Sequence, residues 1–140
     1  MLQDLHAAFS GRLLRAADDM APFLTDWRRK WTGSALAVVQ PDTAADVAAV
    51  LRWCAQHRVP VVPQGGNTGM SGGATPDTSG QALVLSLARL NRVRAVDAAN
   101  HTITVEAGLT LQQVQDAARA VDRLFPLSLA AQGSCTIGGN

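Results

Sequence analysis

The stretch from Pro60 to Asp77 reads PVVPQGGNTGMSGGATPD, and it contains five glycines between residues 65 and 73. Glycine loses more backbone entropy on folding than other residues, so a folded chain keeps a glycine cluster where bare backbone must approach something closely. Backbone N–H groups that no side chain screens can converge on an anion, typically at the end of a strand. The stretch therefore indicates a phosphate-binding loop.

The spacing of the glycines excludes the two commonest phosphate loops. A Walker A loop requires Gly-Lys-Ser/Thr after its second glycine, and this stretch contains no lysine. The dinucleotide fingerprint requires glycines at i, i+2 and i+5, which the glycines at 65, 66, 69, 72 and 73 never satisfy. A flexible linker is disfavoured because two apolar segments bracket the loop. A phosphate cradle is the interpretation that we favour, and a purely structural turn is the alternative.

The other residues that could do chemistry form no catalytic or metal-binding constellation. Cys54 lies on an apolar helical stripe, which indicates a core residue rather than a nucleophile. A general base needs a partner that tunes it, and His6, His57, His101 and Glu106 have none in the sequence. We therefore assign no catalytic residue and no metal site. The two cysteines are far apart and lack a CxxC motif, which favours a reduced, cytoplasmic protein.

Apolar runs on both sides of the loop predict the elements that position it. Residues 35–39, 59–63 and 82–87 read as short buried strands, and a helix follows the first of them. Thr43 can cap this helix, with Asp46 in the capping-box position, and Val47, Val50, Leu51 and Cys54 form its apolar stripe. The loop then lies at the carboxyl end of a central strand, where open sheets bind ligands.

The remaining segments predict a second small lobe and an N-terminal arm. Residues 92–97 and 102–106 alternate in polarity around a turn and read as a hairpin. Thr110 can cap a final helix whose inward positions are Leu111, Val114, Ala117, Ala118 and Val121. Residues 1–24 read as helical, and we treat residues 1–34 as an arm. The predicted fold class is α+β, with two lobes.

The bulk composition limits the partners. A chain of 140 residues with 47% hydrophobic and 16% charged residues is one globular domain, and its net charge of +1 gives no field that would attract nucleic acid or an anionic membrane. The basic run from Arg28 to Lys30, between Trp27 and Trp31, is interpreted as a solvated face. We find no export signal and no membrane-spanning run. Because the sequence stops at CTIGGN, inside a turn-rich motif, we expect a fragment.

Four motifs occur in an order that resembles a known family: PQGGNTGMSGG from Pro63, LVLSLARLNRV from Leu83, TVEAGLTLQQV from Thr104 and FPLSLAAQGSCTIGGN from Phe125. Together they resemble the FAD-binding domain of the PCMH type, in the branch of FAD-linked oxidases that contains D-lactate dehydrogenases, the glycolate oxidase flavin subunit and D-2-hydroxyglutarate dehydrogenase. The resemblance implies that residues 35–140 form this domain, with the first βαβ-like lobe complete and the second truncated.

The resemblance also implies which residues hold FAD. In the family the first glycine loop wraps the pyrophosphate with its backbone amides, which implicates Gly65, Gly66, Asn67, Thr68 and Gly69, with Ser71 and Gly72 near by. Because this loop has no Lys or Arg, we expect its amides and the side chains of Asn67 and Thr68 to be the donors. A second motif passes along the flavin and ribityl chain and implicates Pro126, Gly133, Ser134, Cys135, Thr136, Gly138 and Asn140.

The expected attachment of FAD is non-covalent. Some relatives tether the flavin through a histidine after the paired glycines, but here Asn67 follows Gly66, and an amide nitrogen is not a nucleophile. Cys135 lacks a neighbouring base or cation that would activate it.

The function implied by the resemblance is the oxidation of a 2-hydroxy acid by hydride transfer to FAD, with the substrate held by a domain after Asn140. The fragment alone is then expected to be inactive and to bind FAD weakly. The alternatives are a non-catalytic phosphate-binding or nucleotide-binding module, and another flavoenzyme of the same fold with a different substrate.

Overall fold

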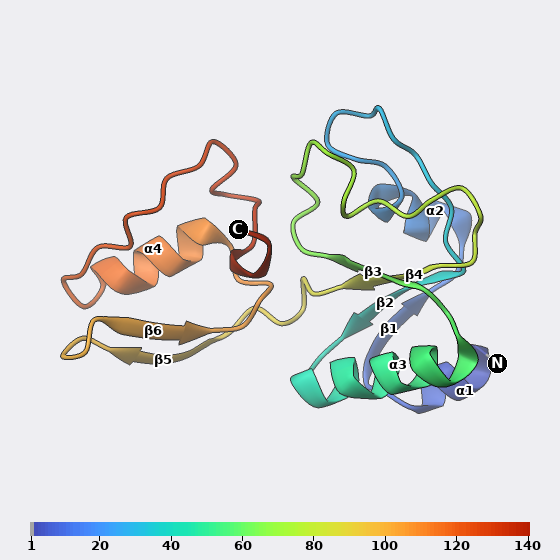
Figure 1. The fold of residues 1–140 in the computed structure, drawn as a ribbon. Helices are drawn as coiled ribbons and strands as arrows, with labels where there is room; N and C mark the ends of the chain where they lie inside the picture. The colour runs from blue at the N-terminus through green and yellow to red at the C-terminus, as the bar shows by residue number, and fades with distance from the viewer. Residues whose placement is uncertain (1) are drawn as a thin grey trace.

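The computed structural model describes residues 2–140, which form two lobes (Figure 1). The first lobe contains α1 (Leu2–Ala7), β1 (Gly11–Leu14), α2 (Ala17–Met20), the 3-10 helix η1 (Ala21–Phe23), β2 (Ala37–Pro41), α3 (Ala44–His57), β3 (Val61–Gln64) and β4 (Leu83–Ser86). The second lobe contains β5 (Val93–Asp97), β6 (Thr102–Val105), α4 (Leu111–Arg119) and the 3-10 helix η2 (Ile137–Gly139). The predicted α+β class is confirmed.

The first lobe is built on a mixed sheet with the strand order β1-β2-β4-β3. Strands β2 and β3 both pair with β4 in parallel, and β1 pairs antiparallel with β2. Both faces of β2 and β4 are buried, as expected of parallel strands that are covered on two sides. Figure 1 shows α1 and α3 on one face of the sheet and α2 on the other.

Helix α3 begins where the sequence predicts and packs through a slightly different stripe. The backbone N–H of Asp46 donates to Thr43 Oγ1 at 3.1 Å, which confirms the N-cap. Val50 and Cys54 are buried as predicted, but Leu51 is 44% exposed and Trp53 is buried instead. The prediction for Leu51 was wrong because α3 lies on the sheet with the side that carries Val50, Trp53 and Cys54.

The N-terminal region differs from its prediction. Residues 1–24 were expected to be helical, but Gly11–Leu14 form the edge strand β1, and residue 1 lies outside the described residues. A Cβ at Gly11 would lie 2.1 Å from the carbonyl oxygen of Gln40, and the φ of Gly11 is +121°. The close pairing with β2 therefore overrides the helical spacing of the leucines, since tertiary contacts decide the structure of short segments.

The second lobe follows the sequence closely. Strands β5 and β6 form the predicted antiparallel hairpin, and Thr110 caps α4 in a reciprocal capping box with Gln113. Leu111, Val114 and Ala118 are buried, while Ala117 and Val121 are half-buried. Figure 1 shows α4 lying along one side of the hairpin.

The buried carboxylate of Glu106, just after β6, bonds to Arg92, the last residue of the segment that connects β4 of the first lobe to β5 of the second. The side chain of Glu106 is 4% exposed and accepts hydrogen bonds from the backbone N–H of Arg92 at 3.0 Å and from Arg92 Nη2 at 3.2 Å. Arg94 Nη2 lies 3.4 Å from the same carboxylate. These contacts, led by the Arg92 side chain, hold the pKa of Glu106 below its ordinary value of 4.5.

We expect Glu106→Gln to destabilise the protein at pH 7 and much less in acid. A carboxylate whose pKa is lowered on folding stabilises the native state above its ordinary pKa, and this contribution is lost as the pH falls through the folded-state pKa. The measurement is the urea unfolding midpoint of both proteins from neutral to acid pH. Asp116→Asn, which removes a surface pair with Arg119, serves as the control and should have a smaller effect. A difference between wild type and Glu106→Gln that is constant with pH would contradict the assignment.

Candidate functional site

The glycine loop, residues 65–74, follows the carboxyl end of β3. It meets a second loop, residues 133–140, which lies almost seventy residues later in the sequence. A Cβ at Gly65 would lie 2.2 Å from Thr136 Oγ1, and a Cβ at Gly66 would lie 1.9 Å from the carbonyl oxygen of Ser134. Real Cβ atoms do not approach other atoms so closely, so the bare backbone of the glycine loop touches the Thr136 side chain and the Ser134 main chain. The structure therefore brings together the two motifs that the sequence singled out.

Gln64 closes the base of the glycine loop. Its side chain is buried at 2% exposure, and Nε2 donates to the carbonyl oxygens of Ala74 at 2.8 Å and Phe23 at 2.9 Å. These bonds tie the two ends of the loop together and fix them to the N-terminal segment. Gln64 is not among the site residues predicted from the sequence, although an amide at the last position of a buried strand before a glycine cluster was an available signal.

Asn67 holds the middle of the loop to the same segment. Its backbone is left-handed, with φ at +52°, and Nδ2 donates to the carbonyl oxygens of Thr25 at 2.9 Å and Pro22 at 3.4 Å. The amide group expected to face a ligand is thus engaged within the chain. In this structure Asn67 contributes the shape of the loop and its backbone N–H.

The backbone donors of the loop stay open. Among the hydrogen bonds of residues 2–140, none is donated by a backbone N–H of residues 65–74. Polar backbone groups that the fold leaves without partners are satisfied by water or by a ligand. A run of such groups, fixed at its base by Gln64 and in its middle by Asn67, is suited to bind an anion.

The second loop is attached to the start of α4. The backbone N–H of Leu111 donates to the carbonyl oxygen of Cys135 at 3.1 Å, and that of Ile137 donates to Leu109 at 2.9 Å. Between these bonds, Thr136 is 5% exposed, and its Oγ1 has no hydrogen-bond partner among the described residues. A buried hydroxyl without a partner is costly in a folded protein, and here it lies beside Gly65.

A cleft of about 300 Å³ lies between the two loops. Its lining contains Gly65, Gly66, Asn67, Thr68, Gly69, Met70, Ser71, Gly73, Ala74, Thr136, Gly139 and Asn140. No charged side chain is among them. An anion in this cleft would be bound by backbone N–H groups and hydroxyls. The sequence predicts these amides and Thr68 as donors, and also the side chain of Asn67, whose Nδ2 instead donates within the chain.

The other predicted site residues lie next to the cleft or away from it. Gly72 contacts Trp31 instead, the carbonyl oxygen of Ser134 lies against Gly66, and the carbonyl oxygen of Cys135 accepts from the N–H of Leu111. The N–H of Gly138 donates to Ala107 at 2.9 Å. Two more predicted residues line no part of this cleft, namely Gly133 and Pro126.

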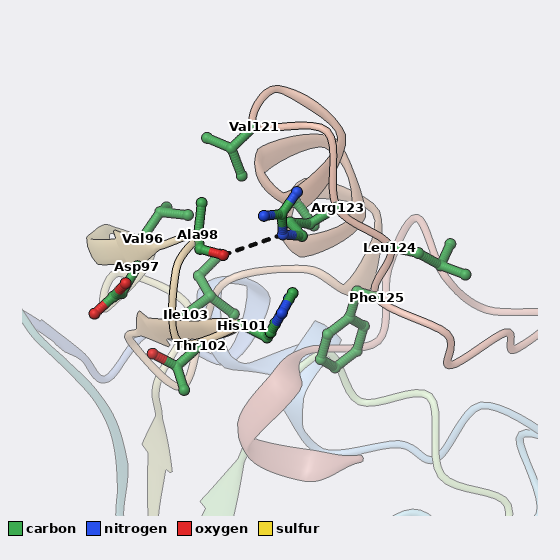
Figure 2. Close-up of a pocket in the computed structure, with 11 residues that line it drawn as sticks. Val96, Asp97, Ala98, His101, Thr102, Ile103, Val121, Arg123, Leu124 and Phe125 are labelled. Carbon is green, nitrogen blue, oxygen red and sulfur yellow. Dashed lines mark hydrogen bonds between the residues drawn. The ribbon is translucent and has the colours of Figure 1, made fainter.

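A separate small cavity of about 80 Å³ lies in the second lobe, between the hairpin and residues 118–125 (Figure 2). His101 and Phe125 line it, and Figure 2 shows the guanidinium of Arg123 directed at the carbonyl oxygen of Ala98, to which Nε donates at 3.1 Å. This cavity has room for very few water molecules, and the guanidinium of Arg123 is already bonded to the Ala98 carbonyl. We therefore do not assign this cavity as a substrate site.

Comparisons with known proteins relate this chain to FAD-binding domains. A model of a family described as FAD binding domain matches residues 35–140. The chain is 44% identical over 129 residues to D-2-hydroxyglutarate dehydrogenase of Xanthomonas citri pv. viticola, which covers 92% of this chain and 27% of that protein. It is 35% identical over 139 residues to mitochondrial D-2-hydroxyglutarate dehydrogenase of Bos taurus, covering 99% and 25%. The chain spans about a quarter of the length of these curated relatives.

Solved structures share the fold at low sequence identity. Alkyldihydroxyacetonephosphate synthase superposes with a TM-score of 0.88 at 16% identity, covering 99% of this chain and 28% of that chain. p-Cresol methylhydroxylase superposes with a TM-score of 0.78 at 22% identity and the same coverage. At these identities the comparison shows the fold alone.

The contact between the loops can be tested with two alanine substitutions. We expect Gly66→Ala to lower the free energy of unfolding by about 1–3 kcal/mol, because its Cβ would collide with the Ser134 carbonyl. Gly69→Ala is the matched control, since a Cβ at Gly69 meets nothing within 4 Å. It should leave stability unchanged or raise it by up to about 1 kcal/mol. Equal urea unfolding midpoints for the two variants would show that the loops do not touch as described.

Proposed function

The chain belongs to the family of FAD-binding domains, and we propose that the protein containing it is a flavin-dependent dehydrogenase of a 2-hydroxy acid. The predicted resemblance to this family and the predicted cofactor, FAD, are confirmed at the level of the family. The cleft between the two glycine loops is the observation that carries the proposal. The similarity to D-2-hydroxyglutarate dehydrogenases supports a substrate of the D-2-hydroxyglutarate, D-lactate or glycolate class.

The residues of the cleft fit FAD. Its diphosphate carries about two negative charges and needs several hydrogen-bond donors. The open backbone N–H groups of residues 65–74 are such donors, and the unpartnered Oγ1 of Thr136 is another. When FAD is bound, it supplies the acceptor for a hydride from the substrate. The residues we propose to hold it are the lining residues Gly65 to Gly69 and Ser71, with Thr136 and Asn140 from the second loop.

We place the groups that bind and deprotonate the hydroxy acid outside these 140 residues. His57 Nδ1 lies 2.8 Å from the carbonyl oxygen of Trp53, and its ring stacks on that indole. Glu106 is engaged by Arg92, and His101 lines the small cavity of the second lobe. None of the three lines the cleft between the glycine loops, so each has a structural role.

Two alternatives and the cellular location remain predictions. The fold is shared with enzymes as different as alkyldihydroxyacetonephosphate synthase, so the fold alone does not select a hydroxy acid. A non-catalytic module would use the same cleft for another phosphate ligand. Among the described residues, no helix is long and apolar enough to cross a bilayer. A cytoplasmic location is the one we propose, although the relative from Bos taurus is named as mitochondrial.

The substrate proposal predicts that the full-length protein purifies with bound FAD and that one D-2-hydroxy acid bleaches its yellow absorbance. D-2-Hydroxyglutarate, D-lactate and glycolate are added separately without oxygen, and the L-enantiomers of the first two are the controls. A protein that takes up no FAD on reconstitution would refute the proposal. A yellow protein that no hydroxy acid bleaches would favour another flavoenzyme of the same fold.

We also propose that FAD is held without a covalent bond. Asn67 stands where a tethering histidine would follow the paired glycines, and Cys135 is 4% exposed, so its thiol is enclosed by the second loop. Acid precipitation of the full-length protein should therefore release all of the yellow colour into the supernatant. Colour that stays with the pellet would contradict this, and its loss in Cys135→Ala would identify the attachment point.

A further inference from the structure

The cleft between the glycine loops contains no cation, but a second, open cleft on the same loop does. Gly66 and Asn67 line both clefts, so the second one lies against the same stretch of backbone. Its other wall comes from the turn that follows Thr25 and includes Asp26, Trp27 and Arg29. From the sequence, the basic run in this turn was expected to be a solvated face.

Of the three consecutive cations in the turn, Arg29 is the one that lines this cleft. Arg28, Arg29 and Lys30 are all exposed, but Arg28 and Lys30 do not contribute to its wall. Within residues 2–140, Arg29 forms no salt bridge. No carboxylate of the described residues therefore neutralises its charge.

The backbone of Arg29 is held in an unfavourable conformation. Its φ is +55°, in the left-handed region that costs a residue other than glycine roughly 1–2 kcal/mol. The backbone N–H of Arg29 donates to the carbonyl oxygen of Asp26 at 2.9 Å. This hydrogen bond and the left-handed backbone fix the place of Arg29 at the tip of the turn.

The carboxylate of Asp26 builds this turn. It is 3% exposed, and Oδ1 accepts from the backbone N–H groups of Lys30 at 2.7 Å and Trp31 at 2.8 Å. These N–H groups, led by that of Trp31, hold the pKa of Asp26 below its ordinary value. The negative charge is thus compensated by backbone dipoles, and Arg29 does not have to neutralise it.

We propose that Arg29 is the cation of the FAD site, and that its guanidinium binds the diphosphate held by the amides of the glycine loop. The inference rests on the proposed function. A guanidinium presents several N–H donors in a plane and suits phosphate oxygens, so it complements neutral donors that cannot offset the charge of a diphosphate. Arg29 acts on binding and contacts no reacting atom.

The test compares matched substitutions at neighbouring positions in the full-length protein after removal of its FAD. Arg29→Asn and Lys30→Asn each remove one positive charge from the same turn, and asparagine tolerates the left-handed conformation. FAD is titrated, and the dissociation constant is read from the quenching of flavin fluorescence. We expect Arg29→Asn to weaken FAD binding about ten- to hundred-fold and Lys30→Asn less than about threefold. The effect at residue 29 should shrink as salt is added.

Arg29→Gly separates binding from folding. Glycine relieves the strained φ, which offsets its greater entropy in the unfolded chain, so the thermal unfolding midpoint of the FAD-free protein should be unchanged or higher. FAD binding should still weaken as much as in Arg29→Asn.

The outcomes separate this inference from the proposed function. Equal dissociation constants for Arg29→Asn and Lys30→Asn would overturn the inference while leaving the FAD site intact. Weaker binding in Arg29→Gly that accompanies a lower unfolding midpoint would also overturn it, because the arginine would then act through the fold. A wild-type protein that binds no FAD would instead refute the proposed function.

Discussion

The meeting of the two lobes depends on a close contact between the backbone of the glycine loop and the second loop. Gly65 and Gly66 approach Thr136 and the Ser134 carbonyl so closely that no Cβ fits between the loops. This contact fixes the end of β3 against the start of α4, to which the second loop is bonded. Since each loop belongs to a different lobe, the same contact sets how the lobes meet and leaves a cleft lined by main chain. Glycine is required here because of proximity rather than flexibility.

Around this cleft, side chains hold the loops in place and backbone N–H groups remain open to a ligand. Gln64 and Asn67 donate their amide protons to carbonyl oxygens of the chain, and Asp26 accepts backbone N–H groups in the neighbouring turn. These side chains fix the shape of the loops and do not face the cleft as free donors. The N–H groups of residues 65–74 are thereby left open in a fixed arrangement. Preorganised donors lose little entropy on binding, which favours a ligand with many acceptor oxygens.

The sequence predicts the local features of this fold and misses features that depend on distant segments. Thr43 and Thr110 were identified as caps because capping depends on residues within one turn. The strand at Gly11–Leu14 was missed because its partner, β2, begins more than twenty residues later. Gln64 was missed for the same reason, since its partner Phe23 is 41 residues away. Gly65 and Thr136 were placed in one site by resemblance, and spacing alone could not have shown that they touch.

Binding and lobe arrangement are linked in this architecture. The lobes are joined by the segments around Leu87 and Gly108, where the N–H of Gly108 donates to Leu90 at 2.7 Å, and by the contact between the glycine loops. A ligand that filled the cleft would contact both loops, so it would bind this arrangement more tightly than any state in which the loops separate. By linkage, each stabilises the other: occupancy of the cleft strengthens the lobe contact, and a firmer lobe contact raises the affinity for the ligand. The close approach of the glycines thus acts in binding as well as in folding.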